Sequence, residues 1–408
     1  MDNVILHLDF DSFFASVEQQ YSPVFRGKPF VVTAQNGRTC IIASSREAKK
    51  LGIKTGCRLW EAKRICPDLL IASADFIKYW EVSKKFINIC KDYSPFVEVF
   101  SIDEVFIDVT KTYHLFGGLN PMIFKIKQRI RKEIGEYITV SVGISHNKLL
   151  AKLASSIKKP DGIYKIGFRD IDFVYAKACL TDICGIGERI AFRLNEIRIF
   201  TLLDLRKTSF DLLVARFGES EARFLRNVSL GIDNSSVVPY TVVQNAKSIG
   251  RHYCLPKNEY DKREVFKNIY ELCEEIGIKL RRLKKKAKTV GLSLYGDTKI
   301  NARKTHKTYF NEGKDIFDLA TSLIDINNLN YVRQIAVWVS GLEEESNISL
   351  SLFDCDLKRD KLIKAVDAIN ERFGDHTIRN AFLLYADKLT TVPNGYLADS
   401  FERLKLAG

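Results

Sequence analysis

The sequence predicts an α/β protein made of several domains. Its 408 residues exceed the roughly 100–200 residues that one domain usually holds, so we expect about two to four domains. Segments with strand-like and helix-like patterns alternate along the first part of the chain. A stretch with helical patterns alone follows, and a second module of strands and helices comes after it.

The first module is expected to be a sheet covered by helices. The apolar runs Val4 to Phe10 and Phe100 to Val109 predict two buried strands. An insertion over residues 19–75 contains VVTAQNGRTCIIASS, which suggests two strands, and REAKKLG, which suggests a helix. The other expected elements are a helix near Tyr79 to Tyr93, a helix at Asn120 to Gly135, a strand at Thr139 to Ile144, a helix at Lys148 to Ile157 and a turn at Pro160-Asp161-Gly162.

The rest of the chain divides at a polar stretch. Residues 181–232 have helical patterns throughout, and residues 233–246 are polar and contain Pro239, which is typical of a linker. Residues 247–342 predict the second α/β module. An acidic GLEEES segment, a short hydrophobic motif and an amphipathic helix from Leu357 to Phe373 follow it.

Both predicted buried strands carry carboxylates. Asp9 ends the first, and the adjacent Asp103 and Glu104 lie in the second, where an acid is costly to bury unless a cation compensates it. Neighbouring strand residues point to opposite faces, so only one of the pair faces Asp9 directly unless the backbone kinks. A pair of Mg²⁺ or Mn²⁺ ions, with nucleotide phosphates completing the ligand shells, would relieve the repulsion among three carboxylates. For either stretch alone, a helix N-cap or a salt bridge explains the acids equally well.

Seven ordered segments over residues 1 to about 240 carry a family resemblance. They are DFDSFFASVE (9–18), GKPFVV (27–32), EAKKLGIKTG (47–56), SIDEVFIDV (101–109), SVGISHNKLLAKLAS (141–155), KKPDGIY (158–164) and CGIGERIAFRL (184–194). Together they resemble the catalytic core of the Y-family (translesion) DNA polymerases, of the bacterial DNA polymerase IV and polymerase V catalytic-subunit type. The resemblance implies a template-directed DNA polymerase that adds dNTPs to a primer 3′-hydroxyl by a two-metal mechanism, error-prone and without proofreading. Its implied partners are primer-template DNA and dNTPs.

The resemblance also implies the right-hand architecture of polymerases. The expected domains are an α/β palm (1–18 and 76–165), small fingers (19–75), a helical thumb with a helix-hairpin-helix motif (166–232), the linker (233–246), an α/β little finger that binds DNA (247–342) and a C-terminal tail with a clamp-binding motif and a helix (343–408).

The acids are assigned to metal binding and catalysis by the same resemblance. Asp9 and Asp103 would bridge two Mg²⁺ ions, and the carbonyl of Phe10 would add a ligand. Glu104 would bind the metal that activates the primer 3′-hydroxyl. Asp11 would be structural and bond to backbone at the start of the next helix.

The resemblance further implies the residues around the incoming nucleotide. Backbone amides of Phe13 and Phe14 would hold the triphosphate at a helix start, where the helix dipole favours anions. The family usually places a Tyr and an Arg over the phosphates, but the matched positions hold Arg46 and Lys49. Lys49 keeps the charge without the bidentate fork of arginine. Lys159 matches the family's other phosphate-binding lysine.

Phe14 has a second implied role as a steric gate. Its ring would fill the space that a ribose 2′-hydroxyl needs. The alternative is ordinary core packing, because Phe10, Phe13 and Phe14 cluster in one apolar stretch.

The distribution of charge indicates a polyanionic partner. The net charge is +13, and residues 240–310 hold 17 Lys or Arg against 7 Asp or Glu. KSIGRHY (247–253) and KINARKTHK (299–307) interleave basic residues with apolar and aromatic ones at strand-like spacing, which suits a phosphate backbone. The densest run is KLRRLKKKAK (279–288). Since most charge runs form a solvated helix face, we expect this run to form one as well. The residues expected to bind DNA here are Lys247, Ser248, Arg251, Arg303, Lys304 and Lys307.

In the helical stretch, Cys184-Gly185-Ile186-Gly187 and the basic helix after it resemble one helix-hairpin-helix motif. Two glycines let the turn approach a phosphate closely, and exposed amides with Arg189 can hold it. The motif predicts contacts to the DNA backbone that do not depend on base sequence.

The tail contains a candidate interaction peptide, SLSLF at residues 349–353. It resembles the sliding-clamp-binding peptide of bacterial polymerases, with Leu350, Leu352 and Phe353 as the clamp-binding residues. Ser349 stands where the family has Gln. A plain strand packed on the preceding module is the competing interpretation.

The remaining sequence features concern the location of the protein, its cysteines and its oligomeric state. No apolar run reaches the roughly 20 residues of a membrane span, and no charged-plus-apolar leader precedes the first strand, so we expect a cytoplasmic protein without membrane contact. Nine scattered cysteines without a CxxC pair are expected to be free, mostly buried thiols with no zinc site. We also expect a monomer.

Two alternatives stay open at this point. A catalytically silent relative could serve as a scaffold bound to DNA and clamp, but such a protein would have lost the acids. A nucleotide cyclase can use a similar palm with two metals, but it has no use for duplex DNA.

Overall fold

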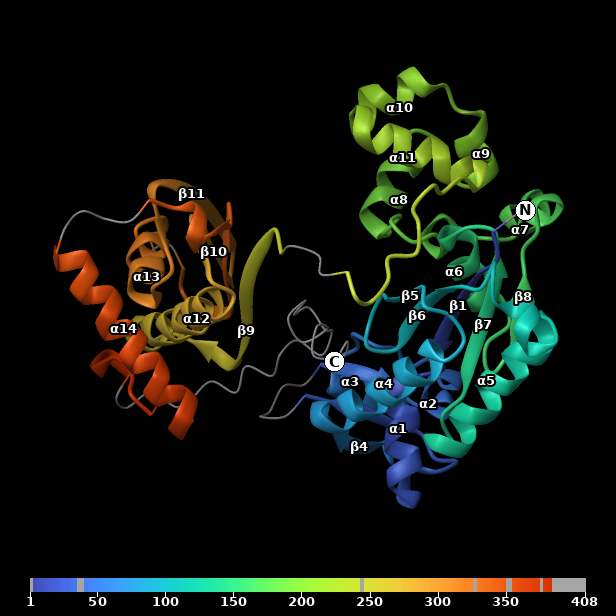
Figure 1. The fold of residues 1–408 in the computed structure, drawn as a ribbon, viewed down its shortest axis with the longest axis horizontal. Coiled ribbons are helices and arrows are strands. Elements are labelled where there is room, and N and C mark those ends of the chain that lie inside the picture. Colours follow the sequence, from blue (N-terminus) through green and yellow to red (C-terminus); the bar gives the residue numbers. More distant parts are fainter. Residues whose placement is uncertain are drawn as a thin grey trace. The chain divides into compact units, whose positions relative to one another are not determined.

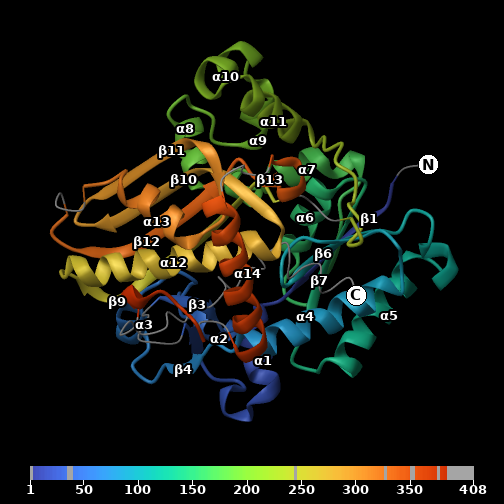
Figure 2. The ribbon, with the colours of Figure 1, turned by 60° about the vertical axis from the view of Figure 1, so that its left-hand side comes forward.

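The computed structural model describes residues 3–34, 40–242, 246–325, 329–349, 354–374 and 377–383. The described residues form two compact units, one containing residues up to 242 and the other the residues from 246 onward. This division falls within the predicted linker. Figures 1 and 2 show the elements of each unit from two directions.

The first unit is built around a five-stranded sheet with the order β5-β6-β1-β7-β8. The central strand β1 pairs antiparallel with β6 and with β7, and β7 pairs parallel with β8. The strands span Ile5–Phe10 (β1), Val97–Val99 (β5), Glu104–Asp108 (β6), Val140–Ser145 (β7) and Ile163–Lys165 (β8).

Helices pack on both faces of this sheet, and successive residues of β1 point to opposite faces. Leu6, Leu8 and Phe10 are buried in one core with side chains of α4 and α5. Ile5 faces the other way and packs with Ala151 of α6. The helices span Phe76–Lys91 (α4), Leu119–Glu133 (α5) and Lys148–Ile157 (α6).

A smaller three-stranded sheet and the first helices belong to the same unit (Figure 1). The insertion contains the two strands and the helix that were predicted. It also contains a short helix and a third strand that were not, α3 and β4, which are too short for a clear periodic pattern. The elements span Phe13–Tyr21 (α1), Phe30–Thr33 (β2), Ile41–Ser44 (β3), Arg46–Lys50 (α2), Leu59–Ile65 (α3) and Leu70–Ser73 (β4).

A helical region follows the sheet, as predicted. Its apolar side chains share a core with Leu150 and Leu153 of α6, so this region packs directly on the helix above the sheet. The helices span Ile171–Tyr175 (α7), Glu188–Asn195 (α8), Leu202–Lys207 (α9), Phe210–Phe217 (α10) and Glu219–Leu230 (α11), and 3₁₀ helices of this unit span Pro23–Phe25, Tyr113–Phe116, Phe168–Asp170 and Leu180–Asp182.

The first half of the predicted linker is bound to the sheet of the first unit. Val237 is buried against the sheet and α6. The amide of Val238 donates to a carboxylate oxygen of Glu98 at 2.8 Å, and the amide of Tyr240 donates to the carbonyl of Val97 at 2.8 Å. Because β5 and its neighbours satisfy this backbone, residues 237–240 form a strap along the sheet rather than a free connector.

The second unit is an antiparallel sheet with two helices on one face. The strand order is β11-β10-β12-β9, and β13 also pairs with β10. Val290 and Leu292 of β10 and Val337 of β12 pack in one core with the helices α12 and α13. The elements span Ser248–Glu259 (β9), Lys262–Arg282 (α12), Lys285–Gly296 (β10), Lys299–Phe310 (β11), Gly313–Thr321 (α13), Val332–Ser340 (β12) and Glu343–Glu344 (β13).

The tail packs on the helices of the second unit. The guanidinium of Arg281 in α12 donates to Asp367 of α14 from Nε at 2.6 Å and from Nη2 at 2.8 Å. Further along, Phe382 packs on Tyr270 of α12. The predicted amphipathic helix is therefore part of this unit. The helix α14 spans Asp354–Phe373, and 3₁₀ helices span Glu345–Asn347 and Ala381–Leu383.

Candidate active site and nucleic-acid interface

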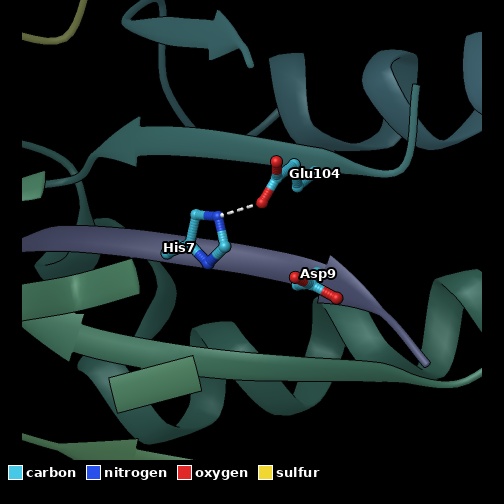
Figure 3. Close-up of side chains that lie close together, drawn as sticks. All are labelled: His7, Asp9 and Glu104. Atoms are coloured by element: carbon cyan, nitrogen blue, oxygen red, sulfur yellow. Dashed lines mark hydrogen bonds and ion pairs between the residues drawn. The ribbon is translucent and has the colours of Figure 1, made fainter. Parts of the chain in front are cut away.

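Two acids and a histidine meet where β1 and β6 pair (Figure 3). Asp9 of β1 lies opposite Glu104 of β6 in the antiparallel register. His7 precedes Asp9 by two residues and therefore points to the same face of the strand. One possible ligand atom from each of the three residues lies within 4.8 Å of the other two, a spacing that can hold a metal ion.

Asp103 lies in a bend of the chain just before β6, next to Glu104. The strand begins at Glu104, not at Phe100 as predicted, and residues 101–103 form a bend. The amide of Phe10 donates to the carbonyl of Asp103 at 3.0 Å, which fixes the bend beside the end of β1. The predicted strand was too long: Asp103 lies in the bend and Glu104 begins the strand, and the charges of Asp9 and Glu104 act on Asp103.

The chemistry of these carboxylates suits divalent cations. Burial raises the pKa of Asp103, and the charges of Asp9 and Glu104 add to the rise, so that its pKa is about 6 despite a hydrogen bond from the hydroxyl of Ser101 at 2.6 Å. A carboxyl with this environment is stabilised in its charged form by a nearby cation. Oxygen-only donors of this kind are the ligands that Mg²⁺ and Mn²⁺ take.

Glu104 is held by partners on one of its oxygens. Nε2 of His7 lies 3.0 Å from Oε2 of Glu104, and the ammonium of Lys152 contacts the same oxygen. Burial alone would raise the pKa of Glu104, but these partners outweigh it and lower the pKa to about 2. Burial lowers the pKa of His7. On the far side of the ring, Nδ1 of His7 lies 2.8 Å from Oγ of Ser155.

Two lysines expected at the phosphates lie beside this cluster. Lys159 forms an ion pair with Oδ1 of Asp9. Lys49 donates to Oγ of Ser12 at 2.8 Å. Burial, followed by the charge of Lys159, lowers the pKa of Lys49. Both ammonium groups therefore lie within reach of the end of β1.

Arg46 belongs to a different cluster, around Asp11. Its guanidinium contacts Oγ1 of Thr139 and lies 3.7 Å from the Asp11 carboxylate. Asp11 accepts from the hydroxyls of Thr139 and Ser141 and from the amide of Asp161, each at 2.7 Å. The expectation that Asp11 bonds to backbone at the next helix was wrong, because it ties β1 to β7 and to the turn before β8.

The helix α1 begins directly after β1, beside the carboxylates. Ser12 has the left-handed conformation, with φ 53° and ψ 50°. The first bond inside the helix runs from the amide of Ser16 to the carbonyl of Ser12 at 2.9 Å, so the amides of Phe13 and Phe14 precede the helical ladder. The ring of Phe14 is 8% exposed and stacks on Tyr79, with 4.5 Å between the ring centroids.

The glycine turn of the helical region leads into α8. Gly185 has φ of +100°, and a Cβ at this position would lie 2.4 Å from the ring of Phe224, so a larger residue would be strained and would clash. Gly187 is the N-cap of α8. Arg189, in the first turn, is exposed. The geometry is that of a turn whose amides and one guanidinium can approach a phosphate.

The sheet of the second unit has an open face, on the side opposite α12 and α13. Its residues are mostly small or polar, and Oγ1 of Thr289 and Oγ1 of Thr305 lie 2.9 Å apart across two strands. Trp338 lies over Gly291, where a Cβ would come within 2.2 Å of the indole. The open face is made of Ser248, Gly250, His252 and Cys254 of β9, Gln334, Ala336, Trp338 and Ser340 of β12, Thr289, Gly291, Ser293 and Tyr295 of β10, and Lys299, Asn301, Arg303 and Thr305 of β11.

The two basic segments predicted as strands are the edge strands β9 and β11. Arg303 is exposed on the open face, opposite Gly291. Arg251 points to the helical side instead, where its Nε donates to Glu275 of α12 at 2.9 Å. The other residues of this set, Lys247, Ser248, Lys304 and Lys307, are exposed.

The densest basic run, residues 279–288, is divided among different elements. The helix α12 ends at Arg282, Lys284 turns the chain with φ of +53°, and β10 begins at Lys285. The interpretation as one solvated helix face was therefore wrong, because the turn redirects the second half of the run into the sheet.

Three further expectations concern the tail peptide, the cysteines and membrane spans. Leu350, Leu352 and Phe353 lie outside the described residues. Among the eight cysteines with described side chains, only Cys90 and Cys273 are buried, so the expectation of mostly buried thiols was wrong. No helix in the described ranges is long and apolar enough to cross a membrane.

Four residues around the acids were not predicted: His7, Lys152, Ser155 and Ser101. His7 did have a signal in the sequence, because a polar residue inside a buried strand, two positions from Asp9, must face the same side. Lys152 and Ser155 had none. Their positions depend on how α6 packs over the sheet, which sequence periodicity does not give.

Comparison with known proteins identifies the class. The pattern of the impB/mucB/samB family matches residues 8–156, and that of the family's C-terminal domain matches residues 246–352. The chain is 33% identical to the DNA polymerase IV of Oceanobacillus iheyensis over 92% of this chain and 90% of that protein. It is 34% identical to the DNA polymerase IV of Pelotomaculum thermopropionicum over 93% of this chain and 95% of that protein.

A solved structure agrees with these relatives. A Y-family DNA polymerase chimera of Dbh and Dpo4 matches with a TM-score of 0.71 and 28% identity, covering 84% of this chain and 99% of that one. The protein is therefore a DNA-directed DNA polymerase, with primer-template DNA and dNTPs as its substrates. Within that class the chain belongs to the Y-family of translesion polymerases, which confirms the resemblance of its sequence segments, and its fold is the palm, fingers, thumb and little finger of that family.

Proposed function

We propose that this polymerase extends a primer 3′-hydroxyl by a two-metal mechanism at Asp9, Asp103 and Glu104. The observation that carries the proposal is that Asp9 lies opposite Glu104 where β1 and β6 pair, and that the charges of both help to raise the pKa of the neighbouring Asp103. When bound there, with the carbonyl of Phe10 as a further ligand, Mg²⁺ or Mn²⁺ ions neutralise charge in phosphoryl transfer and acidify the attacking hydroxyl. The three acids would bind the ions, and the strands fix the spacing of the acids.

The triphosphate is assigned to the amides at the start of α1 and to two lysines. The first-turn amides of α1 and the helix dipole favour an anion at this point. Lys49 and Lys159 bring two positive charges to the same place, and Lys159 exchanges its ion pair with Asp9 for a phosphate oxygen. Arg46 would first have to break its contacts with Thr139 and Asp11. The two lysines therefore bind the phosphates in place of the family's Tyr and Arg.

Selection of the sugar is assigned to Phe14. Its side chain follows the end of β1 by four residues and is held by aromatic neighbours, which gives it a fixed position beside the nucleotide site. A fixed ring can exclude a 2′-hydroxyl, because yielding to it would disturb the core behind. The same burial also supports plain packing as the alternative.

Binding of duplex DNA is assigned to two surfaces, one in each unit. In the thumb, the turn from Gly185 to Gly187 offers amides and Arg189 to a phosphate. In the second unit, small and hydroxyl-bearing residues on the open face permit close approach of a sugar-phosphate backbone, and Arg303 adds charge. Arg251 is not free for this role while it pairs with Glu275.

We also propose clamp binding through Leu350, Leu352 and Phe353, a monomeric enzyme, and error-prone synthesis without proofreading. The clamp proposal is supported by the SLSLF sequence itself, which combines leucines and a phenylalanine that can fill an apolar pocket. The other two rest on the family resemblance.

Primer extension with purified protein tests the proposal. Extension is expected on an undamaged and on an abasic template with Mg²⁺, and none with EDTA. Glu104→Gln should lose extension while keeping DNA affinity, whereas Asp92→Asn, which changes an acid outside the cluster, should extend normally. Metal-independent extension, or full activity of Glu104→Gln, would contradict the mechanism.

A further inference from the structure

We infer that His7 is a positioning residue that fixes the carboxylate of Glu104 so that one oxygen faces the metal and the primer terminus. The inference rests on the proposed function and adds to it a residue outside the acid triad. Its basis is the set of contacts around His7, Glu104, Lys152 and Ser155.

Among the described residues, both side-chain contacts of Glu104 go to the same oxygen. His7 Nε2 lies 3.0 Å from Oε2, and the Lys152 ammonium contacts Oε2 as well. Two partners from different elements, β1 and α6, thus fix the rotation of the carboxylate. Within the described part of the chain, Oε1 is left to face a ligand.

Ser155 contacts the other nitrogen of the His7 ring. An ionised carboxylate only accepts hydrogen bonds, so the neutral ring must donate to Glu104 from Nε2. On the other side of the ring, Nδ1 lies 2.8 Å from Oγ of Ser155, whose hydroxyl also lies 2.8 Å from the carbonyl of Lys152. Ser155 and Glu104 thus contact the His7 ring at its two nitrogens and fix its orientation.

The ring is too confined to act as a mobile base or to turn toward solvent. His7 is completely buried, and its ring lies 4.6 Å from that of Phe106, centroid to centroid. Phe106 is also the register partner of His7 on β6, so the strand that carries Glu104 holds the ring as well. A side chain fixed at both nitrogens and along its face acts through Glu104. Outer partners of this kind typically contribute about 10- to 100-fold to metal affinity or activity.

The test compares His7→Leu, which keeps an apolar side chain but no donor, with His7→Gln, whose amide can donate from a place near that of Nε2. Mn²⁺ affinity is measured by EPR on the protein bound to a dideoxy-terminated primer-template and a dNTP. The single-turnover rate of addition, DNA affinity, dNTP affinity and melting temperature are measured alongside. Ser155→Ala tests the contact at Nδ1, and His146→Gln, at a half-buried histidine stacked on Phe168, is the control.

His7→Leu is expected to lower Mn²⁺ affinity and the rate of addition by about 10- to 100-fold, with DNA and dNTP affinities unchanged. His7→Gln should recover most of both losses, Ser155→Ala should show a smaller loss in the same direction, and His146→Gln should behave like the wild type. A folded His7→Leu with wild-type Mn²⁺ affinity and rate would overturn the inference, as would His7→Gln failing as badly as His7→Leu. Coupling of an imidazole nitrogen to Mn²⁺ in the pulsed EPR spectrum would also overturn it, because the ring would then be a ligand itself.

The same titration separates this inference from the function beneath it. If the wild type and Glu104→Gln bind Mn²⁺ equally, the proposed metal site fails and the role of His7 fails with it. If Glu104→Gln loses Mn²⁺ affinity but His7→Leu does not, only the inference about His7 fails.

Discussion

Replacing Phe14 by Ala distinguishes a steric gate from ordinary core packing. Phe14 is 8% exposed, stacks on Tyr79 at 4.5 Å and meets Phe76 edge-on at 5.9 Å. Truncating such a ring typically costs about 3–5 kcal/mol. At about 2–4 °C per kcal/mol for a unit of this size, the melting temperature should fall by roughly 6–20 °C.

The gate interpretation adds an effect on the substrate that packing does not. Forcing extra atoms into a filled site typically costs about 1–3 kcal/mol, which corresponds to roughly 5- to 160-fold in kcat/KM. Phe14→Ala removes that penalty for a 2′-hydroxyl. The preference for a dNTP over the matched rNTP should therefore shrink by about this factor.

Phe13→Ala is the matched control. Phe13 is the adjacent residue of α1, is 4% exposed and stacks on Phe10 at 5.0 Å, so its loss should lower stability similarly. Steady-state kinetics with matched dNTP and rNTP, below both melting temperatures, give the discrimination ratio. The gate interpretation requires a changed ratio in Phe14→Ala and an unchanged ratio in Phe13→Ala. Equal ratios in both variants would refute it.

The remaining predictions concern the acids, the DNA surfaces and the tail. Glu104→Ala should abolish nucleotide addition while DNA affinity, measured by fluorescence anisotropy, stays nearly intact; surviving extension would sink the metal assignment. DNA affinity should fall steeply with salt and vary little with sequence, and a flat salt dependence would contradict phosphate binding by the thumb turn and the open face. Leu352→Ala with Phe353→Ala should leave distributive synthesis unchanged but remove stimulation by a loaded sliding clamp, so equal stimulation would refute the peptide. Arg281→Ala should destabilise the second unit by about 1.5–3 kcal/mol in denaturant unfolding, and a double-mutant cycle with Asp367→Ala that shows no coupling would disprove the pairing.

Elements whose signals are local could be predicted well from the sequence. The helix α6 spans Lys148–Ile157, as predicted, because Asn147 caps it by accepting from the amide of Leu150 at 2.9 Å and the Pro160 turn follows. The bend before β6 was not visible, since it depends on a bond from Phe10. The strap at residues 237–240 was missed for the same reason.

The candidate site shows the same division. The three acids stood out because carboxylates at the ends of buried strands violate the apolar pattern. Arg251 shows where composition misleads. It lies in a basic strand, but the alternation of side chains along the strand turns it toward α12, where it pairs with Glu275. The contact of Lys152 in α6 with Glu104 could not be predicted, because it depends on how that helix packs on the sheet and no local sequence pattern gives this packing.

The ion pairs of Lys159 with Asp9 and of Lys152 with Glu104 have a consequence for how this enzyme can be handled and regulated. Because two ammonium groups already pair with carboxylates at the ends of β1 and β6, we expect the palm to fold without a bound ion. This differs from small zinc domains, in which binding the ion and folding are one event. After chelation of metal ions the protein should remain folded. Restoring Mg²⁺ should then start synthesis without refolding, because the cation replaces an ammonium group beside the carboxylates.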